Sequence, residues 1–164
     1  TTNCVTGRPC YLEEKKDKER LLAIAKASSS LPYVCPITYV DGRPMLDGGI
    51  VDSIPVLRAI EQGYERNVVV LTRNRGYRKS EKDIRVPRFI YTRYPRLRVV
   101  LSRRCQVYNQ QLEMIERMED EGRIIAIRPE QRVVVNRIEK DIKKLTSLYE
   151  EGYACAEKVM GQFL

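Results

Sequence analysis

A predicted β-hairpin that ends in Asp-Gly-Gly constrains the fold of this chain more than any other stretch. Residues 37–40 and 43–46 read Ile-Thr-Tyr-Val and Arg-Pro-Met-Leu, and the Asp41-Gly42 pair between them suits a two-residue hairpin turn. The second strand leads directly into Asp47-Gly48-Gly49. A carboxylate at a strand end, followed by two glycines that let the backbone turn tightly, can be presented into a cleft beside a nucleophile. On spacing alone, the same three residues are more often a simple turn.

The two other carboxylates of this stretch have structural interpretations. Asp41 belongs to the hairpin turn, and Asp52 lies near the start of a short helix that Gly63 closes. Leu57 and Ile60 of this helix are expected to face inward. Asp47 remains as the carboxylate of this stretch that could act beside a nucleophile, and the residues alone leave this role and that of a simple turn both open.

Regular structure is expected on both sides of the hairpin. Short strands are predicted at 2–6 and 11–12, and Asp17 is predicted to cap a helix over 18–28. Residues 67–72 read as a fully buried strand, because Val-Val-Val-Leu is too short for a helix. Strand, helix and strand in this order predict a parallel α/β layer.

Two long helices are predicted in the second half of the chain, over 95–121 and 136–162, with a short strand at 124–127 between them. Gly122 is expected to end the first helix. Each helix has an apolar stripe at steps of three and four, and both stripes are expected to face the core. The stripes are Leu97, Leu101, Cys105, Tyr108, Leu112 and Ile115 in the first helix, and Ile138, Ile142, Leu145, Tyr149, Ala156 and Met160 in the second.

The composition is that of a globular chain without histidine. Its 164 residues, 43% hydrophobic and 32% charged, suffice for one core, and no stretch approaches the roughly 20 apolar residues of a membrane-spanning helix. Without histidine, these residues alone cannot assemble a Ser-His-Asp or Cys-His mechanism or a histidine-dependent zinc site. Acid-base chemistry falls to Asp, Glu, Lys, Cys or Tyr, and no metal and no cofactor are predicted.

The five cysteines are interpreted as reduced, mostly buried thiols of a cytosolic protein. None of them is spaced as Cys-x-x-Cys. A redox or metal pair formed by Cys4 and Cys10 is the alternative, and it would need further ligands.

The net charge of +8 is concentrated in one segment. From Arg73 to Arg104 the chain carries twelve Lys or Arg and two acidic residues, a local charge of +10, so the remainder sums to −2. Arg73, Arg75, Arg78 and Lys79 are candidates for contact with anionic phospholipid headgroups. A solvated surface loop explains the same residues equally well. A nucleic-acid-binding module is the less favoured alternative, because no recognised RNA- or DNA-binding motif accompanies the basic residues.

The stretch over 39–56 resembles the Asp-Gly-Gly/Ala motif of patatin-like phospholipases. Residues 27–32, Ala-Ser-Ser-Ser-Leu-Pro, resemble the segment that these enzymes place before the hairpin, and residues 67–72 resemble their following strand. The resemblance covers residues 1–73, and the basic loop and helices over 74–164 resemble, less specifically, the tail of bacterial patatin-like proteins. It implies an α/β fold, the C-terminal part of a patatin-like α/β/α layered fold followed by a two-helix tail.

In this family a serine in Gly-x-Ser-x-Gly is activated directly by the aspartate, so the resemblance implies that Asp47 is catalytic and that Gly48 and Gly49 support it. None of the seven serines of this chain has glycines two residues away on both sides, and no glycine-rich oxyanion loop is present. The family carries both elements N-terminal to the aspartate. Because Thr1 opens on strand-like residues, we expect a C-terminal portion whose partner is the N-terminal remainder of the same protein.

The implied activity is the hydrolysis of carboxylic or phospholipid acyl esters by a cytoplasmic enzyme that contacts membranes peripherally. The substrate would be a lipid or another ester, and this chain alone would be inactive because it lacks the nucleophile. A helical interaction module built from the two long helices is an alternative that the sequence leaves open.

Overall fold

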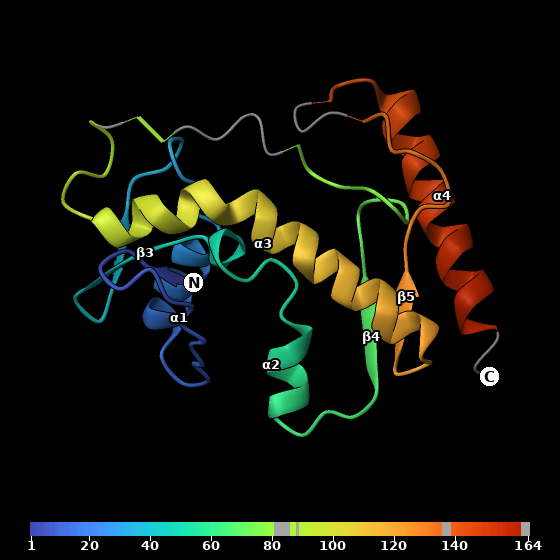
Figure 1. Ribbon diagram of the computed structural model, residues 1–164, viewed down its shortest axis with the longest axis horizontal. Coiled ribbons are helices and arrows are strands. Elements are labelled where there is room, and N and C mark those ends of the chain that lie inside the picture. The colour runs from blue at the N-terminus through green and yellow to red at the C-terminus, as the bar shows by residue number, and fades with distance from the viewer. Residues whose placement is uncertain (81–85, 88, 136–138, 162–164) are drawn as a thin grey trace. The chain divides into compact units, whose positions relative to one another are not determined.

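A computed structural model describes residues 1–80, 86–87, 89–135 and 139–161 (Figure 1). The chain divides into two compact units, and each unit combines two segments of the chain. The first unit contains Thr1–Pro55 and Lys79–Gln111, and the second contains Val56–Arg78 and Leu112–Leu164. The division into domains at residue 73 stays a prediction from the family resemblance.

The first unit is built on a three-stranded antiparallel sheet. Strands β1 (Thr2–Asn3) and β2 (Thr38–Val40) both pair with the central strand β3 (Arg43–Leu46). Asp41 and Gly42 between β2 and β3 have φ angles of 51° and 71°. Positive φ at both positions is the turn geometry that matches the twist of a hairpin. The predicted hairpin is confirmed.

Helix α1 (Lys18–Ser28) begins where the sequence predicts it. The Asp17 carboxylate accepts two backbone N–H groups of the first turn, which otherwise have no partner within the helix. The helix buries Ala27 against Val40 and Met45 of the hairpin. One face of the hairpin is thereby covered.

A second apolar cluster lies around the end of β3 and the start of helix α3 (Pro95–Asp120). Leu46 and Leu97 are 0% exposed, and Ile50 is 1% exposed. The remaining buried members are Cys4 and Leu101. Because Leu46 precedes and Ile50 follows the Asp-Gly-Gly residues, this cluster fixes both ends of the segment that contains Asp47.

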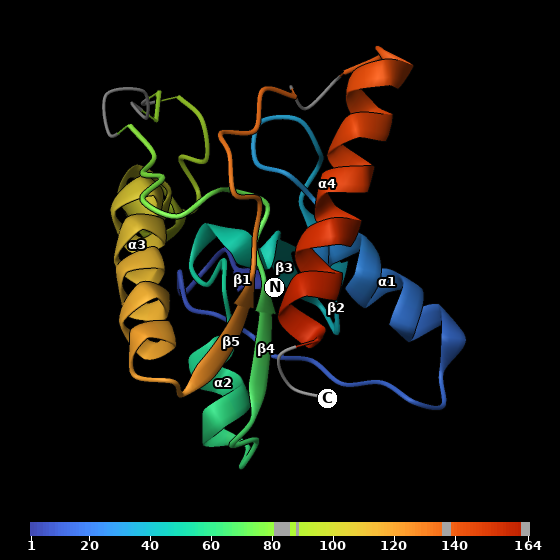
Figure 2. The ribbon, with the colours of Figure 1, turned by 90° about the vertical axis from the view of Figure 1, so that its right-hand side faces the viewer.

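The second unit contains a two-stranded parallel sheet. Strand β4 (Asn67–Val70) pairs with β5 (Ile124–Ile127), and Asn67 lies opposite Ile124 (Figure 2). The predicted parallel layer of hairpin, helix and 67–72 strand is wrong, because β4 pairs in parallel with β5, in a sheet separate from the hairpin. The predicted fully buried strand is buried on one face only, since Val69 is 9% exposed and Val70 is 71% exposed.

Three local expectations are wrong. Residues 11–12 form no strand, and only Thr2–Asn3 of the predicted 2–6 strand pairs with β3. In helix α2 (Val56–Glu61), Leu57 is 52% exposed, because it is Val56 that the helix turns into the core.

Helix α4 (Ile142–Met160) corrects the prediction for the second apolar stripe. Ile142 and Tyr149 are exposed by 76% and 71%. The buried member of the helix is Cys155, on a neighbouring face. The apolar face of α4 is wider than the part of it that is buried. Periodicity alone therefore predicted burial for the wrong side of this face. The predicted start of this helix over 136–138 lies outside the described residues.

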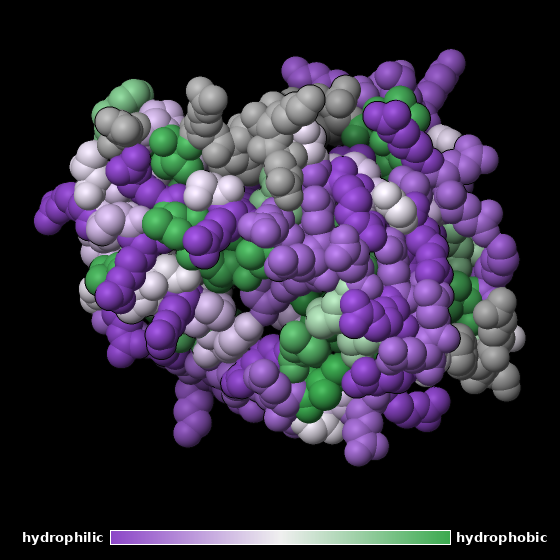
Figure 3. Space-filling model, in the orientation of Figure 1, coloured by the Kyte–Doolittle hydropathy of each residue, from purple (hydrophilic) through white to green (hydrophobic). Residues whose placement is uncertain are grey.

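Hydrophilic side chains predominate on the face of the molecule in Figure 3, with small apolar patches between them. Among the helices of the described residues, none is long and apolar enough to cross a membrane.

Candidate active site

Asp47 follows the last residue of the central strand, and its backbone is held from two sides. Its N–H donates to the carbonyl oxygen of Ser30 over 3.0 Å, and its carbonyl oxygen accepts the hydroxyl of Thr2 over 2.8 Å. Ser30 and Thr2 are themselves buried. The strand end that carries the candidate base is therefore a well-anchored part of the first unit.

The Asp47 side chain caps the 3₁₀ turn η1 (Gly48–Ile50) that follows it. Its Oδ1 accepts the N–H of Gly49 over 2.6 Å, a charge-assisted hydrogen bond that fixes the carboxylate. Within the described part of the chain, Oδ2 has no hydrogen-bond partner. One carboxylate oxygen is thus used for orientation, and the other remains able to accept a proton.

Close approach, and not a positive φ, explains the glycine at position 49. A Cβ atom built there would lie 3.1 Å from Asp47 Oδ1, which is tighter than ordinary van der Waals contact. Gly49 is absent from the glycines with positive φ. The role of Gly49 as support for Asp47 stays a prediction, and the structure adds that the absence of a side chain leaves room for the carboxylate.

The Gly49 carbonyl oxygen is held as well. It accepts the hydroxyl of Ser53 over 2.7 Å and Nε of Arg104 over 3.0 Å. Ser53 is the serine nearest to the candidate base in sequence, and its proton is directed to this carbonyl and not to Asp47. The geometry therefore gives Ser53 no role as the nucleophile.

Asp52, interpreted from sequence only as a residue near a helix start, is part of a hydrogen-bond network. Its Oδ2 accepts the hydroxyl of Tyr11, and its Oδ1 accepts Nε2 of Gln111 over 2.6 Å. Gln111 Oε1 in turn accepts the backbone N–H groups of Ser53 and Ile54 over 3.1 and 3.2 Å. Sequence reasoning missed Arg104 and Gln111, because nothing in their spacing relates them to residues about 55 positions earlier.

Asp41 has the structural role that the sequence predicts. Arg20 binds its carboxylate with Nε and Nη2, over 3.0 and 2.8 Å, and this pairing lowers the pKa of Asp41. Both oxygens of Asp41 are thereby used within the fold, in contrast to those of Asp47.

Three of the four candidate lipid-contact residues lie in the second unit, where two of them form ion pairs with α3. Arg75 Nη2 lies 2.7 Å from Asp120 Oδ2, and Arg78 Nη2 lies 2.7 Å from Glu116 Oε2. Arg73 lies over the ring of Tyr77, 5.1 Å from its centroid. The guanidinium groups of Arg75 and Arg78 are thus already neutralised within the chain.

The fourth candidate, Lys79, belongs to the first unit. Its ammonium group lies 3.7 Å from the ring centroid of Tyr108, within the range of a cation–π interaction. Its backbone N–H donates to Asn109 Oδ1 over 2.8 Å. These contacts attach the end of the 73–79 segment to α3.

Glu116 gives a prediction for stability against pH. Its hydrogen bond to Arg78 lowers the pKa of Glu116 to about 2 from an ordinary 4.5. The contribution of this ion pair to the free energy of unfolding is therefore complete above pH 4.5 and is lost as the pH falls toward 2. Glu116→Gln should lower the free energy of unfolding by about 2 kcal/mol at pH 7. The free energy of unfolding of this variant should also decrease less than that of wild type as the pH falls. Glu113→Gln is the matched control, because Glu113 also faces Arg78 but is 57% exposed. Urea unfolding from pH 7 to pH 2.5 measures both, and parallel curves for wild type and Glu116→Gln would contradict the pairing.

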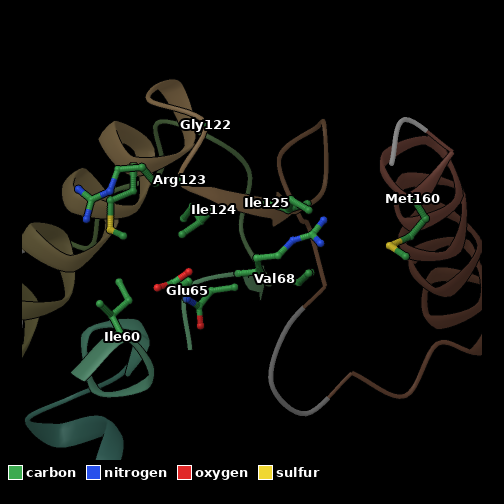
Figure 4. A pocket seen from close by; sticks show the side chains of 11 residues that line it. Ile60, Glu65, Val68, Gly122, Arg123, Ile124, Ile125 and Met160 are labelled. Carbon is green, nitrogen blue, oxygen red and sulfur yellow. The ribbon is translucent and has the colours of Figure 1, made fainter. Parts of the chain in front are cut away.

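A cavity of about 810 Å³ opens in the second unit and does not involve Asp47. Its lining includes Ile60 of α2, Val68 of β4, Ile124 of β5 and Met160 of α4 (Figure 4). Apolar side chains predominate, and Glu65 lies at the same opening. None of the described residues that line it is a serine, and they therefore offer no second candidate nucleophile for acyl-ester chemistry.

The described residues offer no group of three or more His, Cys, Asp or Glu that could hold a metal ion. All five cysteines are free thiols. Burial raises the pKa of Cys4 to about 11, so this thiol is protonated and unreactive at neutral pH. Cys4 therefore behaves as a small apolar residue of the core, in line with the interpretation from sequence.

Two family models match separate parts of the chain. The model of the family described as Patatin-like phospholipase matches residues 11–60, and the model described as a domain of unknown function (DUF6363) matches residues 94–164. The first match supports the patatin-like family. It includes Asp47, Gly48 and Gly49, and it is shorter than the predicted 1–73 resemblance. No curated protein matches the chain.

Proposed function

We propose that this chain supplies the catalytic aspartate of a patatin-like serine acyl hydrolase, and that Asp47 is this residue. The observation that carries the proposal is the Asp47 carboxylate at the end of β3, with Oδ1 fixed by Gly49 and Oδ2 without a hydrogen-bond partner among the described residues. It lies inside the segment that matches the patatin-like family.

The chemistry requires a serine hydroxyl from outside these 164 residues, since they contain no Gly-x-Ser-x-Gly. Asp47 would accept the serine proton as the oxygen attacks the ester carbonyl carbon, and would then return it to the departing alcohol. An acyl-serine remains, which water hydrolyses with Asp47 again as base. A serine-aspartate pair of this kind needs no histidine, in accord with the composition.

Lipid acyl esters are the proposed substrates, on the strength of the family match. Contact of residues 73–79 with anionic headgroups has weaker support, because Asp120 and Glu116 already neutralise Arg75 and Arg78. The cytoplasm is the proposed compartment, and the five free thiols support it.

Ester hydrolysis by two samples tests the proposal. The 164-residue chain alone should hydrolyse neither p-nitrophenyl butyrate nor phospholipid vesicles above the buffer rate, because it has no activated nucleophile. The encoded protein that joins these residues to a Gly-x-Ser-x-Gly segment should hydrolyse at least the butyrate ester. Robust hydrolysis by the 164-residue chain, or none by the longer protein, would refute the proposal.

A further inference from the structure

The backbone of Gly49 connects α3 to the candidate base. On one side its N–H donates to Asp47 Oδ1 over 2.6 Å, and on the other its carbonyl oxygen accepts Arg104 Nε over 3.0 Å. These hydrogen bonds belong to the two peptide groups that meet at the Gly49 Cα atom, the 48–49 group through its N–H and the 49–50 group through its carbonyl oxygen. By holding the carbonyl oxygen of Gly49, the side chain of Arg104 restricts the backbone of the residue whose N–H orients the Asp47 carboxylate.

Gln111 holds the residues that follow the same turn. It lies seven positions after Arg104, on the same face of α3. Its Oε1 accepts two backbone N–H groups, from Ser53 and Ile54, while its Nε2 donates to Asp52 Oδ1. A side-chain amide offers both an acceptor and a donor, and these partners fix the orientation of the Gln111 amide.

All of these contacts lie within the first unit, and both α3 residues lie within the match to the domain of unknown function. We propose that Arg104 and Gln111, here called the α3 anchor, are positioning residues for Asp47. In this proposal, the N-terminal end of the domain of unknown function holds the turn that follows Asp47 in the hydrolase segment. This inference rests on the proposed function.

The alternative is that the α3 anchor only stabilises the fold. The two roles differ in what a substitution changes. A lost positioning contact lowers kcat at nearly constant KM, because the base is misdirected in the transition state while the bound substrate makes the same contacts. A purely stabilising contact would lower the free energy of unfolding and leave the kcat of the folded protein unchanged.

Arg104→Met in the ester-hydrolysing protein tests the inference, with Arg103→Met as matched control. Arg103 is the preceding residue of α3, is exposed, and has the same charge. We expect kcat to fall about 10- to 100-fold for Arg104→Met, KM to change less than about twofold, and Arg103→Met to match wild type. Arg104→Lys should recover part of the loss, because its ammonium can donate to the Gly49 carbonyl.

Gln111→Met, compared with Gln110→Met at an exposed neighbour, gives a second and independent pair. A fall in kcat is expected for position 111 only. An unchanged kcat per folded molecule in both Arg104→Met and Gln111→Met would refute the positioning role. An equal decrease of kcat in the control variants Arg103→Met and Gln110→Met would refute it as well.

Amide hydrogen exchange separates this inference from the proposed function, because it requires no activity. In the 164-residue chain, protection of the Gly49 N–H should fall at least about tenfold in Arg104→Met and stay unchanged in Arg103→Met. Unchanged protection in Arg104→Met would overturn the α3 anchor even in an active enzyme. Lost protection combined with a wild-type protein that hydrolyses no ester would instead overturn the proposed function alone.

Discussion

Asp47→Asn is expected to lower kcat/KM for acyl-ester hydrolysis by about 10³-fold without unfolding the protein. The amide oxygen of asparagine can still accept the Gly49 N–H that Asp47 Oδ1 accepts over 2.6 Å, so the turn should persist. The amide has no basicity near neutral pH, and it therefore cannot take the proton from a serine hydroxyl. Steady-state hydrolysis of p-nitrophenyl butyrate by the nucleophile-containing protein measures the loss, and circular dichroism reports the fold.

Asp41→Asn is the matched control for this substitution. Asp41 has φ 51° in the hairpin turn, a conformation that asparagine also tolerates, and its side chain is 48% exposed. The variant loses the ion pair with Arg20, which is worth about 1 kcal/mol or less at the surface. Its activity should equal that of wild type. Equal losses from Asp41→Asn and Asp47→Asn would show that negative charge on the hairpin matters, and not a base at Asp47.

Leu97→Ala is expected to destabilise the first unit by about 3 kcal/mol. Leu97 is 0% exposed and packs in one cluster with Leu46 and Ile50, so truncation leaves a cavity that the surrounding side chains cannot fill. Urea unfolding measures the change. Val99→Ala is the control on the same helix, because Val99 is 50% exposed, and it should cost less than about 1 kcal/mol.

Because Leu46 and Ile50 are the two sides of the Asp47 turn, Leu97→Ala should also increase amide exchange of Gly49. A destabilisation below about 1 kcal/mol would mean that the start of α3 is not packed against the end of β3. The packing of Leu97 against Leu46 and Ile50 would then be refuted.

Local features were predictable from the sequence because each depends on a few neighbouring residues. The Asp41-Gly42 turn, the Asp17 cap, and the ends marked by Gly63 and Gly122 all lie as predicted. In each case the side chain or a positive φ decides the backbone conformation at that position. The prediction of Asp47 at a strand end also follows from this local information.

Contacts between distant parts of the chain were not predictable. The pairing of β4 with β5 joins residues separated by the whole of α3, and the α3 anchor joins Gly49 to Arg104. A polar helix face gives no sign of which backbone groups it will meet. The burial prediction for α4 was wrong for a related reason. Hydrophobic periodicity identifies an apolar face, but it does not show which side of that face packs against the core.

The pairing of Asp47 with an external serine is the central claim, and covalent labelling of that serine tests it most directly. A fluorophosphonate should react with the nucleophile-containing protein, and peptide mapping should locate the adduct on the serine of a Gly-x-Ser-x-Gly segment outside these 164 residues. Asp47→Asn should slow the labelling by about 10²-fold or more. An adduct on Ser53 or another serine of this chain, or equal labelling rates for wild type and Asp47→Asn, would contradict the claim.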